Sequence, residues 1–207
     1  EKADEKTASI LTSIVPVVLE ENGFEDTYDK QAWEKNKNGT AIHAITWDKN
    51  KHNGLGDVKV SAVDPLNFYP EPGISDIQKS KNIFVLQWVD KEDLKGMYPQ
   101  LEGEALESGF TPERYQTEDS GTRENSRYAV VVDWYYKKYN GPRATVHYCK
   151  FVGTNVLFST EDMGMDGIYD DGEYPFVVDV LFPIKDSFAG RGYIDIGRNA
   201  QESIDLL

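Results

Sequence analysis

The stretch RYAVVVDWYYKKYNGPRATVHYCKFVGTNVLFST, residues 127–160, decides the fold class of this chain. It is rich in the β-branched and aromatic residues that favour strands. Turn residues interrupt it at Asn140-Gly141-Pro142 and again at Val152-Gly153-Thr154. We therefore expect three successive strands that are joined by turns and paired antiparallel.

Downstream of these strands, we expect one more strand and then a helix. Residues 173–184, EYPFVVDVLFPI, have strand composition, and the remainder is a glycine-containing loop that leads into a helix. We interpret Gly190, Gly192 and Gly197 as a hinge at the start of this helix. Asp195 is its candidate N-cap. A phosphate-binding role for these glycines is disfavoured, because no βαβ strand precedes them.

Upstream, the sequence predicts two helices followed by a β-hairpin. Apolar residues recur at helical spacing from Ile10 to Leu19, where Pro16 predicts a kink or a break. Asn-Gly pairs end this helix and the next one, which spans residues 24–39. A change to strand periodicity then gives two strands, TAIHAITWD and DVKVSAVD, around a polar turn at residues 49–56.

The middle of the chain contains a strand, a short helix and a long acidic segment. Prolines at 65, 70 and 72 forbid regular pairing inside a sheet. NIFVLQWV, residues 82–89, has strand composition, and Asp90 is placed to cap a short helix. Residues 100–126 are polar and acidic, so we expect a flexible loop.

These elements predict an α+β fold with antiparallel strand groups and flanking helices. No alternation of strands and helices points to a parallel nucleotide-binding sheet. We divide the chain into four segments: a helical start with the first β group (1–99), the acidic loop (100–126), a second β group (127–194) and the start of a final helix (195–207).

The composition disfavours several classes of protein. The chain has 207 residues, 39% of them hydrophobic and 12% aromatic, which is typical of a globular protein with its own core. A net charge of −14 disfavours a surface that grips nucleic acid phosphates. We expect no membrane span, because no run approaches roughly 18 apolar residues, and no secretory signal peptide.

The acidic stretch EDMGMDGIYDDGEYPF, residues 161–176, raises the question of a metal site. Four carboxylates stand at positions 1, 5, 9 and 12 of a calcium loop: Asp162, Asp166, Asp170 and Glu173. Gly167 supplies the glycine of position 6, but Gly164 at position 3 offers no side-chain ligand. Because strands are expected on both sides, we favour a solvated acidic turn. The four carboxylates are kept as candidate metal ligands, and no cofactor is expected.

The sequence contains no catalytic constellation, and we expect no enzyme. The three histidines lie far apart and outside metal or nucleophile motifs: His43, His52 and His147. Cys149, the single cysteine, excludes an intrachain disulfide and is expected to pack in the core. Carboxylates are abundant, but no pair stands out as the acid and base of a glycosidase. The four tryptophans are expected to pack in the core: Trp33, Trp47, Trp88 and Trp134.

The order of several motifs resembles the portal proteins of tailed bacteriophages, of the short-tailed phage type. The central motif is VDPLNFYPEPGISDIQKSKNIFVLQWVDKEDLKGMYP, residues 63–99, with its proline-flanked turn, strand and closing Tyr-Pro. Upstream, NGFEDTY and NGTAIHAITWD are similar to the helix and strand of the family. Downstream, VVVDWYYKK and GEYPFVVDVLFPIKDSFAGRGYIDIGRNAQESIDLL are similar to its strand, Tyr-Pro-Phe and final helix. The resemblance covers nearly the whole chain.

The resemblance implies that the chain is the wing region of a longer portal subunit, ahead of the stem helices, with no catalytic residues. Members of the family form a ring, usually of twelve subunits, at one capsid vertex. DNA enters and leaves through the ring without sequence-specific binding. The implied partners are copies of the chain, terminase, capsid or scaffolding proteins and head–tail connector proteins. The implied location is the virion, or the host cytoplasm during assembly. Gly190 and Gly192 would then join wing and stem.

A different interpretation stays open beside this one. The acidic loop at residues 162–173 and the tryptophans are also compatible with a secreted calcium- or carbohydrate-binding β module.

Overall fold

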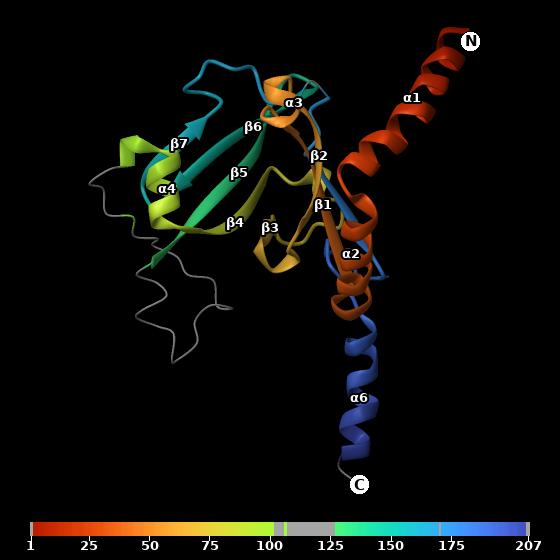
Figure 1. Ribbon diagram of the computed structural model, residues 1–207. Coiled ribbons are helices and arrows are strands. Elements are labelled where there is room, and N and C mark those ends of the chain that lie inside the picture. The colour runs from red at the N-terminus through yellow and green to blue at the C-terminus, as the bar shows by residue number, and fades with distance from the viewer. Residues whose placement is uncertain (1, 102–105, 107–126, 170, 206–207) are drawn as a thin grey trace. The chain divides into compact units, whose positions relative to one another are not determined.

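The computed structural model describes residues 2–101, 106, 127–169 and 171–205. They form two compact units, in which helices combine with antiparallel sheets (Figure 1). The helical unit comprises Glu1–Pro65, Gly73–Ile77 and Pro175–Leu207, and the five-stranded unit comprises Leu66–Pro72 and Gln78–Tyr174. The α+β fold class expected from the sequence is confirmed.

The helical unit opens with two consecutive helices, α1 (Lys2–Glu21) and α2 (Phe24–Asn38). Gly23, at φ 57°, separates them, and Gly39, at φ 85°, ends α2. These left-handed conformations suit glycine, so the Asn-Gly pairs mark both helix ends correctly. Of the kink or break expected at Pro16, the break is wrong, because α1 continues through the proline, and the kink stays a prediction. The proline removes one backbone hydrogen bond without ending the helix.

The helical unit also contains a three-stranded antiparallel sheet in the order β2-β1-β8. Its strands are β1 (Thr40–Asp48), β2 (Asp57–Val63) and β8 (Phe176–Val180), with the short turn α3 (Lys51–Gly54) between β1 and β2. Gln31 of α2 is buried against the sheet, and its side-chain oxygen accepts a hydrogen bond from the backbone N–H of Ile42 at 3.2 Å. The chain then forms β9 (Phe182–Pro183), β10 (Gly190–Arg191) and α6 (Tyr193–Asp205).

The other unit is built on an antiparallel sheet in the order β3-β4-β5-β6-β7. Its strands are β3 (Phe68–Pro70), β4 (Asn82–Asp90), β5 (Tyr128–Asn140), β6 (Arg143–Val152) and β7 (Asn155–Ser159). Its helices are α4 (Lys91–Met97) and the short η3 (Pro99–Leu101); η1 (Pro65–Asn67) and η2 (Ile77–Lys79) cross the unit boundaries. The three strands expected from residues 127–160 are confirmed. The Asp90 cap is also confirmed, since its side chain accepts from the backbone N–H of Glu92.

The five-stranded unit has its own core, on one face of the sheet. Successive residues of a strand point to opposite faces, so Ala129 and Val131, two residues apart, share this face. The core cluster comprises Leu94, Leu101, Leu106, Ala129, Val131, Val152 and Leu157. Leu101 and Leu106 belong to the segment expected to be an acidic loop, and both are buried. The remainder of that loop, residues 102–105 and 107–126, lies outside the described residues.

The sheet pairing groups the strands differently from the four expected segments. β4 pairs with β5, although residues 100–126 separate them in sequence. β8 pairs with β1 in the helical unit and does not join β5 and β6. Strand composition identifies strands but not their partners, because pairing depends on tertiary packing.

Candidate functional site

A row of aromatic rings crosses the second face of the five-stranded sheet. Cross-strand pairing places Phe84 opposite Trp134, and Tyr136 opposite His147. Neighbouring ring centroids along the row lie 5.9, 4.3 and 5.5 Å apart. The Nδ1 atom of His147 lies 3.1 Å from the Thr160 hydroxyl, so the buried imidazole is held in place at the end of the row.

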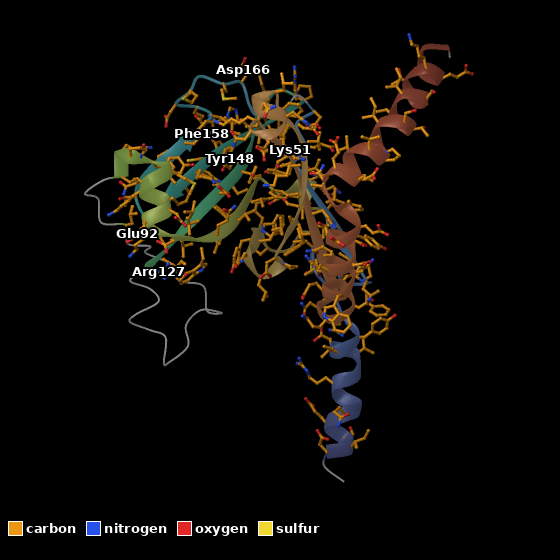
Figure 2. The ribbon with its side chains drawn as sticks, viewed as in Figure 1. Lys51, Glu92, Arg127, Tyr148, Phe158 and Asp166 are labelled. Atoms are coloured by element: carbon orange, nitrogen blue, oxygen red, sulfur yellow. The ribbon has the colours of Figure 1, made fainter. Side chains whose placement is uncertain are left out.

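The row ends at a cleft of about 620 Å³ at the tip of the β5–β6 hairpin. Its lining includes Lys138, Tyr139, Arg143 and His147 from the hairpin, and Asp166 and Tyr169 from the loop after β7. Asp166 is labelled in Figure 2. A hydrogen bond holds the loop against β6: the backbone N–H of Ile168 donates to the Val146 carbonyl at 2.9 Å. Ligand pockets typically measure about 300–1,000 Å³, so the cleft has room for a small molecule.

The cleft carries charges of both signs. Lys138 Nζ lies 2.6 Å from a carboxylate oxygen of Glu161, and the Tyr136 hydroxyl donates to the same carboxylate. The hydrogen bond from Lys138, followed by that from Tyr136, lowers the pKa of Glu161 below its ordinary value. Arg143 and Asp166 add one further cation and one further anion. This balance favours a neutral polar ligand over a strongly charged one.

A buried carboxylate lies on the core face of the same sheet. Asp133 accepts hydrogen bonds from Gln87 Nε2 at 2.7 Å and from the Tyr148 hydroxyl at 2.6 Å, and Lys150 Nζ lies 3.3 Å away. Tyr148 lies beside Phe158 of the neighbouring strand (Figure 2). Burial, and then the charge of Asp133, raises the pKa of Tyr148. The carboxylate is fully paired, which fits a structural role.

The candidate calcium ligands lie in an exposed turn. Asp162, Asp166 and Glu173 are exposed, and Asp170 lies outside the described residues. Backbone hydrogen bonds tighten this turn, including one from Met165 N to Thr160 O at 2.9 Å. In the part of the chain that the structure describes, these carboxylates do not converge into a group of three ligands.

The structure instead brings together three other potential ligands, Glu21, His52 and Asp57. His52 Nε2 lies 3.2 Å from an Asp57 oxygen and 3.6 Å from a Glu21 oxygen. The hydrogen bond from the Val58 backbone, and then that from His52, lowers the pKa of Asp57. The ammonium group of Lys51, on the neighbouring turn (Figure 2), donates to Asn22 and to the Val58 carbonyl. These contacts form an exposed ion-pair cluster. No motif in the sequence predicts it.

Two of the three expected hinge glycines lie at a close backbone crossing with the end of α2. A Cβ at Gly190 would lie 2.3 Å from Val180 Cγ1, and a Cβ at Gly192 would lie 2.1 Å from the Lys37 carbonyl oxygen. Gly39 faces the same crossing, where its Cβ would lie 2.3 Å from the Arg191 carbonyl carbon. Gly197 has no atom within 4 Å of its would-be Cβ. The first two glycines are therefore required by close approach, and the hinge motion itself stays a prediction.

Asp195 is not the N-cap of α6, because the helix already begins at Tyr193. Its carboxylate instead reaches back and accepts from the backbone N–H of Gly192 at 3.4 Å. This is the reciprocal contact that an acidic residue makes from the third helical position.

The helical unit exposes much of its apolar surface. On α1, the exposed large apolar side chains recur at i, i+3 and i+4 spacing: Ile10, Leu11, Ile14, Val15 and Val17. On α6, they are Tyr193, Ile194, Ile196 and Ile204. The expectation of core packing is wrong for Trp33 and Trp47, which are 69% and 60% exposed. Cys149, in contrast, is buried as expected.

A groove of about 500 Å³ lies where α1 meets α2. Leu19, Phe24 and Tyr28 form its apolar lining, and Glu20 and Glu25 add two carboxylates. The ring centroids of Phe24 and Tyr28 lie 6.1 Å apart. Sequence patterns did not predict this groove, although the run of acidic residues around Phe24 and Tyr28 is a signal for it.

No protein-family model and no curated protein matches this sequence. None of the helices in the described residues combines the length and the apolar character that a membrane crossing requires.

Proposed function

We propose that this chain is the wing region of a portal subunit, a structural component of the ring through which a tailed bacteriophage packages and ejects its genome. The observation that carries the proposal is the exposed apolar surface of α1 and α6. Apolar stripes of this kind on a soluble chain mark contacts with other proteins. A ring subunit needs such contacts on two sides, one for each neighbour.

The charge of the chain supports a conduit wall. With a net charge of −14, the chain repels the DNA backbone, and strong phosphate contacts would retard a moving duplex. The proposed partners are therefore proteins: copies of the chain, terminase, capsid or scaffolding proteins and head–tail connectors. The proposed location is the portal vertex of the virion, and the host cytoplasm during assembly. No step of this function requires catalysis by the chain.

Electron microscopy of the full-length protein tests the proposal. We expect rings with a central hole in the purified protein. A preparation that stays monomeric at concentrations well above micromolar would contradict it.

A second candidate function is a secreted calcium- or carbohydrate-binding β module. The cleft at the hairpin tip favours carbohydrate binding over calcium binding. It combines two tyrosines with hydrogen-bond donors and acceptors on both cationic and anionic side chains. Calorimetric titration separates the candidates: saccharide binding that is lost in Tyr169→Ala, or micromolar calcium binding that is lost in Asp166→Ala, would favour the module.

A further inference from the structure

We infer that the tip of the β5–β6 hairpin of one copy inserts Tyr139 into the groove between α1 and α2 of the next copy. This inference rests on the proposed function, since it names the contact that joins neighbouring copies in the ring.

The groove offers an apolar floor inside an acidic surround. Residues 19–29 contain five carboxylates and no Lys or Arg. In the described part of the chain, neither Glu20 nor Glu25 forms an ion pair, so both remain available to a cation from outside. Phe24 and Tyr28 present two tilted rings, against which a third aromatic ring can pack edge to face. The groove therefore fits an aromatic side chain flanked by basic residues.

The hairpin tip has this composition. Residues 134–160 contain four cations and no carboxylate, in a chain whose net charge is −14. At the tip, Tyr139 is 59% exposed, with Lys138 and Arg143 beside it along the cleft. Glu161 already compensates part of the charge of Lys138, and Asp166 lines the same cleft as Arg143, so the excess positive charge at the tip is smaller than that of the two strands alone. β5 and β6 pair up to Asn140 and Arg143, so only Gly141 and Pro142 form the turn. The tip is therefore a tight two-residue turn.

The two surfaces complement each other in residue composition and charge. Burial of a tyrosine among apolar side chains, ringed by ion pairs between Lys138 or Arg143 and the groove carboxylates, has the composition of an interface hot spot. Opposite potentials on the two surfaces also favour one orientation of approach. Since groove and tip are different surfaces, the contact is head to tail, and repetition of such a contact closes a ring when the rotation permits.

Photo-cross-linking of the full-length protein tests the contact while an aromatic group is kept at the tip. Tyr139 is replaced by benzoylphenylalanine, and the variant is mixed with ¹⁵N-labelled wild-type chains, so that cross-links between copies are identified by mass. We expect cross-links to the peptide that contains Leu19–Tyr28. Their yield should exceed by about tenfold the yield from a control with the probe at Leu66, which is also 59% exposed, because docking raises the effective concentration. Equal yields would overturn the inference.

Reversal of the charges on the groove and on the tip is the second experiment. Glu20→Lys with Glu25→Lys reverses the groove, and Lys138→Glu with Arg143→Glu reverses the tip. We expect each variant alone to lower the groove cross-link at least tenfold, and a mixture of the two variants to restore it. Glu202→Lys, an exposed change on α6, should leave it unchanged. Loss without restoration would contradict the charge pairing.

The result is independent of ring formation. Rings without this cross-link would keep the proposed function and place the contact elsewhere. The cross-link without rings would keep the contact and remove the proposed function.

Discussion

The two units of the chain differ in how their helices place apolar side chains. The five-stranded unit encloses them: Leu94, Val131 and Val152 are at most 1% exposed. The helical unit buries Ile42 and Phe176, but its first and last helices leave apolar side chains in water, with Leu11 54% exposed on α1 and Ile204 63% exposed on α6. The first unit can draw its stability from its own core, whereas the second carries apolar surface that only a partner can bury.

In the helical unit, the backbone at Gly39 packs closely against Arg191, and one added methyl group tests how much this contact contributes to stability. We expect Gly39→Ala to lower the free energy of unfolding by about 4 kcal/mol, since it adds left-handed strain and an overlap with Arg191. Hydrogen exchange of β1 and β8 amides measures the loss. The matched control is Gly197→Ala, which meets no atom and should stabilise α6 by about 0.5–1 kcal/mol. Unchanged exchange in Gly39→Ala would show that the crossing does not hold this unit.

The five-stranded unit should instead be sensitive to truncation in its core. Leu94→Ala is expected to cost about 3 kcal/mol, because the cavity it leaves lies among fully buried neighbours. Chemical denaturation followed by hydrogen exchange of β4–β7 measures this cost. Leu55→Ala, at an 83% exposed site in the helical unit, should stay within about 0.5 kcal/mol. A cost below about 1 kcal/mol for Leu94→Ala would remove the contrast between the units.

The strands of both units could be predicted from the sequence, because their signals are local. Alternating β-branched and aromatic residues, with glycine at the turns, predicted β5, β6 and β7. The partner of β8 could not be predicted, since its pairing with β1 joins residues far apart in the chain and leaves no local trace. Trp33 shows a second limit. Apolar residues at helical spacing identify a face that avoids water, but not whether the same chain or a partner covers it.

The candidate site was less predictable than the fold. The calcium spacing of residues 162–173 was present, but ligands must also converge in space, and an exposed turn does not bring them together. Glu21, His52 and Asp57 do converge, from three separate elements, and no motif relates them. The tight fit of Gly190 and Gly192 against α2 could not be distinguished from hinge freedom, because both favour glycine.

At alkaline pH, the two units should differ further in stability. Burial raises the pKa of Tyr135, Tyr148 and Tyr174, all in the five-stranded unit. The unfolded chain loses these protons near pH 10, whereas the folded unit retains them. Their contribution to stability is therefore complete below about pH 10 and is lost as the pH rises above it. We expect β4–β7 to unfold in this range before the sheet of the helical unit does.

The substitution Tyr148→Phe isolates one of these groups. It should make the alkaline loss of stability shallower by about 1.4 kcal/mol per pH unit, since one fewer proton is released on unfolding. Denaturation at several pH values, with tyrosinate absorbance as a monitor, measures the slope. The control is Tyr193→Phe, at an exposed site on α6, which should not alter it. An unchanged slope in Tyr148→Phe would show that this hydroxyl titrates alike in the folded and unfolded chain.

The smallest effect on stability is expected where the apolar surface is most exposed. Leu11→Ala with Val15→Ala should change the free energy of unfolding of the monomer by less than about 0.5 kcal/mol, since both side chains already face water on α1. The same pair should weaken self-association of the full-length protein by about tenfold or more, because burial of each side chain at a contact would contribute about 1 kcal/mol or more. Sedimentation over a concentration series measures the association, with Leu55→Ala as a control that is exposed outside α1. If the pair destabilised the monomer and left association unchanged, α1 would be an ordinary part of the fold, and the contrast between the two units would lose its functional meaning.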